Sequence, residues 1–197
     1  RMAERGATPQ IPEFRRRALR AVGSLCRPLQ LDDYLEMIDP LLSTRELRGQ
    51  IERIEPEAAG AATVVIRPGH DWPGHLPGQY LRVGVLVNGI HHWRAYSLTH
   101  GPRRDGQISI TVKAIPDGAV SQHLVRDARA GQMVQLAQAE GDFVLTPPVA
   151  GRQQKLLLVT AGSGITPVIG MLCNLFSRAE PVRADIVLLH SALSRAE

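Results

Sequence analysis

Short runs in which apolar and polar side chains alternate occupy the middle of the chain, from about residue 46 to residue 146. This alternation is typical of β-strands that bury one face and expose the other. Glycine, proline, asparagine and aspartate separate the runs and predict turns. Six strands at this close spacing predict an antiparallel β-barrel or sandwich. They are expected over residues 47–54, 63–67, 79–87, 91–99, 107–115 and 132–139, with a short helix over 120–128.

The pattern changes after Pro147 and Pro148, where longer apolar runs replace the alternation. Residues 155–161 predict a continuous apolar strand, residues 167–176 a helix, and residues 184–190 another apolar strand. This order indicates a βαβ unit of a parallel sheet. Two strands and one helix cannot cover both faces of such a sheet. We therefore expect the start of an α/β nucleotide-binding type of domain that this chain does not complete.

An arginine-rich segment precedes the strands and ends near Pro40. Within it, Leu31, Tyr34, Leu35 and Ile38 recur at the helical period and predict a buried apolar stripe. The chain is therefore expected to have three parts: a helical N-terminal extension over residues 1–45, a β-barrel domain over 46–148 and a partial α/β domain over 149–197.

The composition adds a modest positive charge, because 23 Lys and Arg residues face 19 Asp and Glu residues. The run Arg15-Arg16-Arg17 fits a solvated face or a membrane-surface patch. Since no aromatic interleaving or nucleic-acid motif accompanies it, no nucleic-acid partner is expected. Cys26 and Cys173 are too few for a disulfide framework, which fits a reducing compartment. We expect a cytoplasmic protein in which the basic first half of the N-terminal segment, residues 1–45, can meet an anionic membrane.

An uncharged run over residues 156–176 is long enough to span a bilayer. Gly162, Gly164, Pro167 and Gly170 interrupt it, together with polar Ser and Thr residues. A buried strand, a glycine turn and a helix therefore explain the run better than a membrane helix.

The turn of the predicted βαβ unit is the first of three motifs that could bind a ligand. It reads Ala-Gly-Ser-Gly-Ile-Thr-Pro over residues 161–167. Its glycines permit a tight turn and let a pyrophosphate approach the amides at the helix N-terminus. Pro167 suits the first helical turn, where its missing N–H is not needed. Because the third glycine of the dinucleotide fingerprint is absent, a tight turn without a ligand remains an alternative.

The second motif is Arg94-Ala95-Tyr96-Ser97, late in a predicted strand. Alternation places Arg94 and Tyr96 on one face, where a cation could hold a phosphate beside a ring that stacks on a planar group. Ser97 then points to the other face. A surface Arg–Tyr pair without a ligand is the structural alternative.

The third motif opens the short predicted helix and comprises Gly118, Ala119, Val120 and Ser121. Free N–H groups at a helix start can bind an anion. Ordinary helix capping explains the same residues without a ligand.

Together with Pro77-Gly78-Gln79-Tyr80, these motifs follow one another in an order and spacing that resembles the ferredoxin-NADP⁺ reductase superfamily, from about residue 46 to the end. In that family R-x-Y-S is a flavin motif, and G-x-G-I-T-P is typical of the nucleotide domain. The segment D-Y-L-E at residues 33–36 also resembles reductases that serve fatty-acid desaturases.

The resemblance implies a role for each motif. Arg94 would bind the FAD pyrophosphate, Tyr96 would lie against the flavin, and Ser97 would hydrogen-bond near N5, where hydride arrives. Thr166 would lie close to the flavin edge, so Ser97 and Thr166 are the catalytic candidates. The implied cofactor contacts also include Ala95, Val112, Lys113, Gly118, Ala119, Val120 and Ser121 for FAD, and Gly162, Ser163, Gly164, Thr166 and Pro167 for NADPH or NADH.

The resemblance thus implies an FAD-dependent oxidoreductase that passes electrons from NAD(P)H to a ferredoxin-type iron–sulfur protein or domain, with a membrane-bound desaturase as a candidate recipient. Arg195 could accept a 2′-phosphate, which favours NADPH. No C-x₄-C-x₂-C iron–sulfur run occurs in the sequence.

Three alternatives stay open at this point: the reductase component of a ring-hydroxylating oxygenase, a non-catalytic flavin or nucleotide module that regulates a partner, and a basic membrane-surface adaptor. No metal site is expected, because the adjacent His91 and His92 point to opposite faces of their strand.

Overall fold

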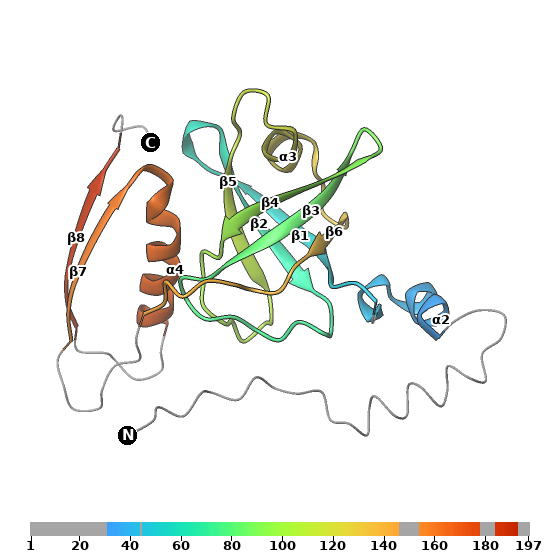
Figure 1. The fold of residues 1–197 in the computed structure, drawn as a ribbon, viewed down its shortest axis with the longest axis horizontal. Coiled ribbons are helices and arrows are strands. Elements are labelled where there is room, and N and C mark those ends of the chain that lie inside the picture. The colour runs from blue at the N-terminus through green and yellow to red at the C-terminus, as the bar shows by residue number, and fades with distance from the viewer. Residues whose placement is uncertain (1–30, 44, 146–153, 178–183, 193–197) are drawn as a thin grey trace, which may run out of the picture.

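The computed structural model describes residues 31–43, 45–145, 154–177 and 184–192, which form two sheets with their helices (Figure 1). The larger sheet has six strands in the order β4-β3-β6-β1-β2-β5, and all its neighbours pair antiparallel. A further antiparallel bridge joins Leu98, just after β4, to Ile110 in β5, so the two edges of the sheet meet. The expected antiparallel barrel is confirmed. Its strands are β1 Arg48–Pro56, β2 Ala61–Pro68, β3 Tyr80–Val87, β4 Ile90–Ser97, β5 Ile108–Lys113 and β6 Met133–Leu136.

The inward faces of the strands fill the barrel with one apolar core. Leu81, Val83 and Val85 come from β3, and their alternation along the strand is the pattern expected of a half-buried strand. The helix α3 Ala119–Gln122 continues into a π-helical turn, η3 His123–Asp127, and this segment adds Leu124 to the core. The barrel is therefore a closed scaffold, and α3 is held against it.

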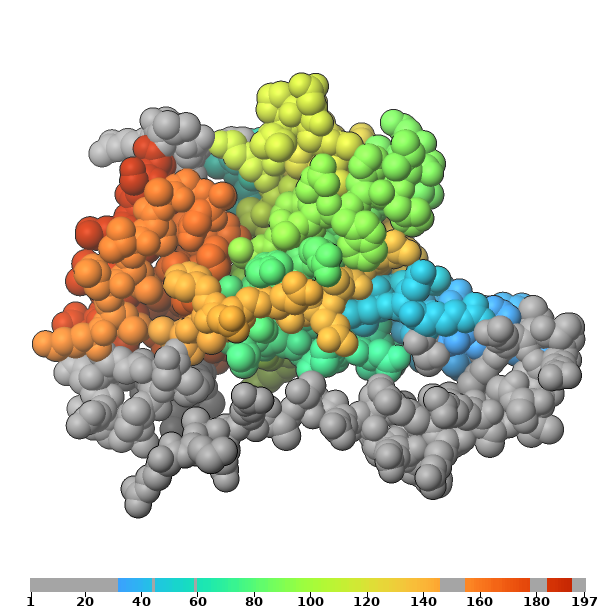
Figure 2. Space-filling model, viewed as in Figure 1, coloured from blue at the N-terminus to red at the C-terminus, as the bar shows by residue number. Residues whose placement is uncertain are grey.

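The smaller sheet pairs β7 Gln154–Ala161 with β8 Ala184–Ser191 in parallel, which confirms the expected βαβ unit. A single 3₁₀ turn, η4 Gly162–Gly164, links β7 to the helix α4 Ile165–Phe176. In the ribbon view α4 lies between this sheet and the barrel, and Figure 2 shows the orange and red residues of the unit beside the green residues of the barrel. No helix in the described part of the chain is long and apolar enough to cross a bilayer.

The segment before the barrel forms the helix α2 Leu31–Ile38 and the 3₁₀ turn η1 Pro40–Leu42. The expected buried stripe on α2 is largely wrong, because Tyr34 is 41% exposed and Ile38 is 79% exposed. The segment is instead attached by buried Leu41 and by an ion pair of 3.1 Å between Arg48 and Glu36. The basic run at residues 15–17 lies outside the described residues.

One face of the β7–β8 sheet is apolar and exposed. Leu157, Val159, Val187 and Leu189 are 66%, 70%, 50% and 55% exposed, and the register places them in two neighbouring pairs. Because exposed apolar sheet faces promote association, we expect the 197-residue chain to associate as its concentration rises. Changing Leu157 and Val187 to threonine should lower the association seen by light scattering, whereas Ile115→Thr at another exposed site should not. Equal association of all three proteins would contradict this expectation.

Candidate functional site

The register of β4 on β3 decides which way the Arg-Ala-Tyr-Ser motif faces. Arg94 pairs with Val83 and Tyr96 pairs with Leu81, so both side chains share the face of buried residues. Tyr96 packs partly against the core, and burial raises the pKa of its phenol while the positive charge of Arg94 opposes that rise. Arg94 is exposed, and its Nη1 donates to the carbonyl oxygen of Trp93 at 2.7 Å. A cation and a half-buried ring therefore stand side by side, as the alternation predicted.

Ser97 pairs with Tyr80 and lies on the opposite face of β4 from Tyr96. The next residue, Leu98, leaves the strand and donates its N–H to the carbonyl oxygen of Gln79 at 2.9 Å. Ala95 is exposed on the same outer face as Arg82, its partner in β3. Ser97 therefore stands at the end of β4, where its backbone can also present polar groups.

The start of α3 packs against β3 and β4. The Ser121 hydroxyl is used within the turn, because it donates to the Gly118 carbonyl at 3.1 Å and accepts from the Ile115 N–H at 3.3 Å. A Cβ on Gly118 would overlap Ser121 Oγ, so a side chain does not fit there. The amides of Ala119 and Val120 lie in the first turn, where N–H groups have no partner within the helix. The backbone, rather than the serine hydroxyl, is the part of this turn suited to an anion.

Val112 and Lys113 lie at the end of β5, where they pair with Ala62 and Ala61. The Val112 side chain is 1% exposed and belongs to the barrel core, so it cannot line a ligand site. Lys113 is exposed. A ligand at this strand end would therefore meet the backbone of Val112 and not its side chain.

The glycine turn between β7 and α4 has the shape that the sequence predicts. Gly162 has a φ of 50°, in the left-handed region that favours glycine. A Cβ on Gly162 or Gly164 would meet nothing within 4 Å, so the backbone is open on this side. Thr166 Oγ1 donates to the Ser163 carbonyl at 2.9 Å, and Pro167 lies in the first turn of α4. The open backbone leaves room for a phosphate to approach the helix start.

Residues 69–145 match the family model described as an oxidoreductase FAD-binding domain. The chain is 43% identical over 185 residues to an NADPH oxidoreductase of Mycobacterium tuberculosis, and this alignment covers 91% of the chain and 47% of the relative. The chain belongs to the ferredoxin-NADP⁺ reductase superfamily. It spans less than half the length of this relative and 38% of a flavohemoprotein from Halalkalibacterium halodurans, to which it is 29% identical over 76% of its own length.

Solved structures of the superfamily share the fold described here. The FAD/NAD-binding domain of a nitric oxide dioxygenase from Vibrio cholerae has a TM-score of 0.63 and 26% identity, over 77% of the chain and 65% of that structure. The Amycolatopsis cytochrome P450 reductase GcoB has the same TM-score and 25% identity, over 77% of the chain and 44% of that structure. The barrel and the βαβ unit together are thus the architecture of reductase relatives.

The residues present fit the FAD of this superfamily. A flavin dinucleotide combines a planar ring with a doubly charged pyrophosphate, so its site needs an aromatic or apolar surface beside cations and free amides. Tyr96 supplies the ring and Arg94 the cation, both on β4, and α3, whose first turn supplies the amides, contacts this strand. Val112 and the Ser121 hydroxyl fit less well, because one is in the core and the other is bonded within its own turn.

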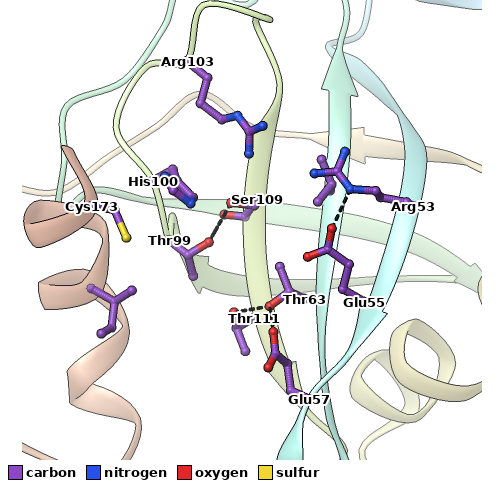
Figure 3. Close-up of a pocket in the computed structure, with 12 residues that line it drawn as sticks. Arg53, Glu55, Glu57, Thr63, Thr99, His100, Arg103, Ser109, Thr111 and Cys173 are labelled. Atoms are coloured by element: carbon purple, nitrogen blue, oxygen red, sulfur yellow. Dashed lines mark hydrogen bonds and ion pairs between the residues drawn. The ribbon is translucent and has the colours of Figure 1, made fainter. Parts of the chain in front are cut away.

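A pocket of about 250 Å³ between the barrel and α4 was not predictable from any sequence pattern (Figure 3). Cys173 of α4 lies on one side of it, and a ladder of hydroxyls lies on the other. Both arginines that line it are ion-paired, since Arg53 bonds Glu55 at 2.6 Å and Arg103 bonds Asp105, outside the lining, at 2.7 Å. The pocket therefore offers an anion little unpaired positive charge. Its hydroxyls are those of Thr63, Thr99, Ser109 and Thr111.

His75 is a buried residue that sequence reasoning missed. Its Nε2 donates to the His100 carbonyl at 2.8 Å, and its ring lies 6.0 Å from that of Trp72. Its Nδ1 is buried without a hydrogen-bond partner. Because histidines are common in loops, its position between Pro73 and Pro77 carries no signal that would distinguish it from an exposed residue.

Stability should fall as the pH drops below about 6.5, the ordinary histidine pKa. Burial lowers the pKa of His75, with its bond to His100 opposing, and burial and the Arg103 charge lower the pKa of His100, with Asp105 opposing. The unfolded chain therefore takes up protons at a higher pH than the folded chain, which lowers the free energy of unfolding as pH falls. Urea unfolding at pH 7.5 and 5.5 should show this loss, and His75→Gln combined with His100→Gln should reduce it. An unchanged difference in the double variant would contradict the assignment.

Proposed function

We propose that the chain is the FAD-binding part, with the first portion of the pyridine-nucleotide part, of an oxidoreductase that moves electrons from NADPH through FAD to an iron–sulfur acceptor. One observation carries this proposal above all: Arg94 and Tyr96 share one face of β4, the strand that α3 contacts. We retain residues 46–148 as the FAD-binding domain and 149–197 as the start of the nucleotide domain.

FAD would supply the redox chemistry, because its ring accepts a hydride and gives up electrons one at a time. The chain's residues would bind and orient it. Arg94 and the amides of Ala119 and Val120 would hold the pyrophosphate, while Tyr96 would cover one side of the ring system. Ser97, at the end of β4, would hydrogen-bond the ring near the atom that receives hydride, and Ala95 and Lys113 would lie beside the cofactor.

The turn after β7 would dock the nicotinamide nucleotide. The backbone of this turn is open at Gly162 and Gly164, which suits a phosphate. The turn ends at the N-terminus of α4, whose dipole favours a negative charge there. Ser163 and Pro167 would shape this turn, and Thr166 would stand nearest the flavin. The M. tuberculosis relative is named an NADPH oxidoreductase, which supports NADPH as the donor.

An iron–sulfur protein or domain is the acceptor that the relatives support best. A structural relative, phthalate dioxygenase reductase, transfers electrons from pyridine nucleotides to [2Fe-2S]; it matches with a TM-score of 0.54 and 25% identity. The resemblance of residues 33–36 to desaturase reductases makes a membrane-bound fatty-acid desaturase our choice of final recipient. The second candidate is an oxygenase, because a methane monooxygenase component C from Methylosinus trichosporium is 33% identical over 57% of the chain.

The proposal is tested first by refolding the chain with FAD or with FMN and measuring the flavin retained. FAD should be retained in preference, because only FAD has the pyrophosphate that Arg94 and α3 would bind. Anaerobic addition of NADPH should then bleach the flavin absorbance. A chain that retains neither flavin would contradict the proposed site, and equal retention of the two would contradict the pyrophosphate contact.

A further inference from the structure

Helix α4 approaches the barrel closely at Gly170, a buried glycine in the middle of the helix. A Cβ on this residue would overlap the carbonyl oxygen of Leu98 and would lie 3.4 Å from the carbonyl carbon of Thr99. These are backbone atoms, so they cannot move aside as a flexible side chain would. Only a residue without a side chain allows α4 to lie at this distance from the segment that follows β4.

The same face of α4 makes a second close approach four residues later. A Cβ on Gly101 would overlap Nδ2 of the Asn174 side chain and would lie 2.6 Å from its Cγ. Thr166, Gly170 and Asn174 are spaced four apart, and residues at that spacing share one side of a helix. The side of α4 that bears Thr166 is therefore the side that rests on residues 98–101.

This contact lies between the two proposed sites along the chain. Leu98 directly follows Ser97, and Gly170 lies one helical turn, about 6 Å, beyond Thr166. We propose that Gly170 is a positioning residue, which lets α4 dock on the Leu98 backbone and so holds the nucleotide turn against the end of the flavin motif. This inference rests on the proposed function for the roles of Ser97 and Thr166, but the docking itself does not.

Alanine at Gly170 separates this role from ordinary helix stability. Within a helix, Gly→Ala normally favours the helix, because it removes the conformational freedom of glycine. Here the added methyl group meets a carbonyl oxygen, so α4 must move away from the barrel or strain its own backbone. Helix propensity thus predicts that Gly170→Ala favours the docked helix, whereas the contact predicts that it weakens the docking of α4. The measured direction of the change in docking decides between them.

Cys173 offers a direct measure of docking, because it lies on α4 and lines the pocket between the helix and the barrel (Figure 3). Serine in place of Cys26, the other cysteine, leaves Cys173 as the single thiol. In that background Gly170→Ala should raise the rate of thiol labelling about tenfold, which corresponds to about 1.4 kcal/mol of docking. Gly164→Ala is the matched control, because it makes the same change at the N-cap of α4, where the added Cβ would meet nothing within 4 Å. It should leave the labelling rate unchanged.

Gly101→Ala tests the interface from the barrel side and keeps the inference testable if Gly170→Ala misfolds. The rate of Cys173 labelling should also rise in Gly101→Ala. The double variant should be labelled little faster than either single variant, because one substitution already displaces α4. Labelling of both single variants at the rate of the parent protein would overturn the proposal.

The functional consequence is measured separately on the FAD-loaded chain. Gly170→Ala should bind FAD as the parent does, with an unchanged flavin spectrum, while NADPH bleaches it ~100-fold more slowly because the nucleotide turn is misplaced. Bleaching at the parental rate despite faster Cys173 labelling would overturn the positioning role. If NADPH bleaches neither protein, the portion of the nucleotide domain in this chain does not suffice for hydride transfer, and the labelling still decides whether Gly170 docks the helix.

Discussion

Replacing Arg94 with alanine is expected to weaken FAD binding about 10- to 150-fold, the equivalent of a charge-assisted hydrogen bond of ~1.5–3 kcal/mol. The guanidinium is exposed beside Tyr96 and donates to the carbonyl oxygen of Trp93, so it lies where it can reach a bound pyrophosphate. Arg94→Lys should recover part of the affinity, because lysine keeps the charge and loses the planar fork of donors. Quenching of flavin fluorescence during titration measures the dissociation constants.

Arg82→Ala is the matched control for this experiment. Arg82 is an exposed arginine on the neighbouring strand, but it pairs with Ala95 and so faces away from Arg94. The substitution removes the same charge, and FAD affinity should hardly change. If both alanine variants lose affinity equally, a general loss of positive charge explains the result and the assignment of Arg94 is wrong. Binding of FMN, which has one phosphate, should depend less on Arg94 than binding of FAD.

The sequence alone predicts the elements well, because their patterns are local. Each barrel strand buries one face, so its apolar residues recur at every second position, as Leu81, Val83 and Val85 do. The two strands of the smaller sheet are continuous apolar runs, and a glycine turn separates the first from α4. The facing of Arg94 and Tyr96 follows from the same two-residue period and is confirmed by their register with β3.

Contacts between distant segments were not predictable in this way. The helical period of α2 predicts a buried stripe, yet Ile38 is 79% exposed, because burial depends on a partner surface that the period does not specify. Val112 matches a cofactor position of the family by order, but the register with Ala62 turns its side chain into the core. The approach of Gly170 to Leu98 depends on how the helix docks, which no local pattern encodes.

Gly78→Ala is expected to lower the free energy of unfolding by about 2–5 kcal/mol, the sum of left-handed strain and overpacking. Gly78 has a φ of 101° and follows Pro77 in a turn that Gln79 N–H closes on the Leu76 carbonyl at 3.1 Å. A Cβ there would overlap the carbonyl oxygen of Phe143 and lie 2.5 Å from Cε of Met171 in α4. At roughly 2–4 °C per kcal/mol for a chain of this size, the melting temperature should fall by about 5–15 °C.

Gly74→Ala separates the two contributions, since Gly74 has a similar φ of 87° but its Cβ would meet nothing within 4 Å. Its free energy of unfolding should fall only by the strain that alanine meets in the left-handed backbone, about 1–2 kcal/mol. The remainder of the Gly78 effect then measures the packing of this turn against Phe143 and α4. Met171→Ala should consequently be less destabilising in the Gly78→Ala background than alone, because the methionine already lacks room there. Equal losses from Gly74→Ala and Gly78→Ala would show that backbone conformation alone requires the glycine of this motif and that the approach of α4 does not.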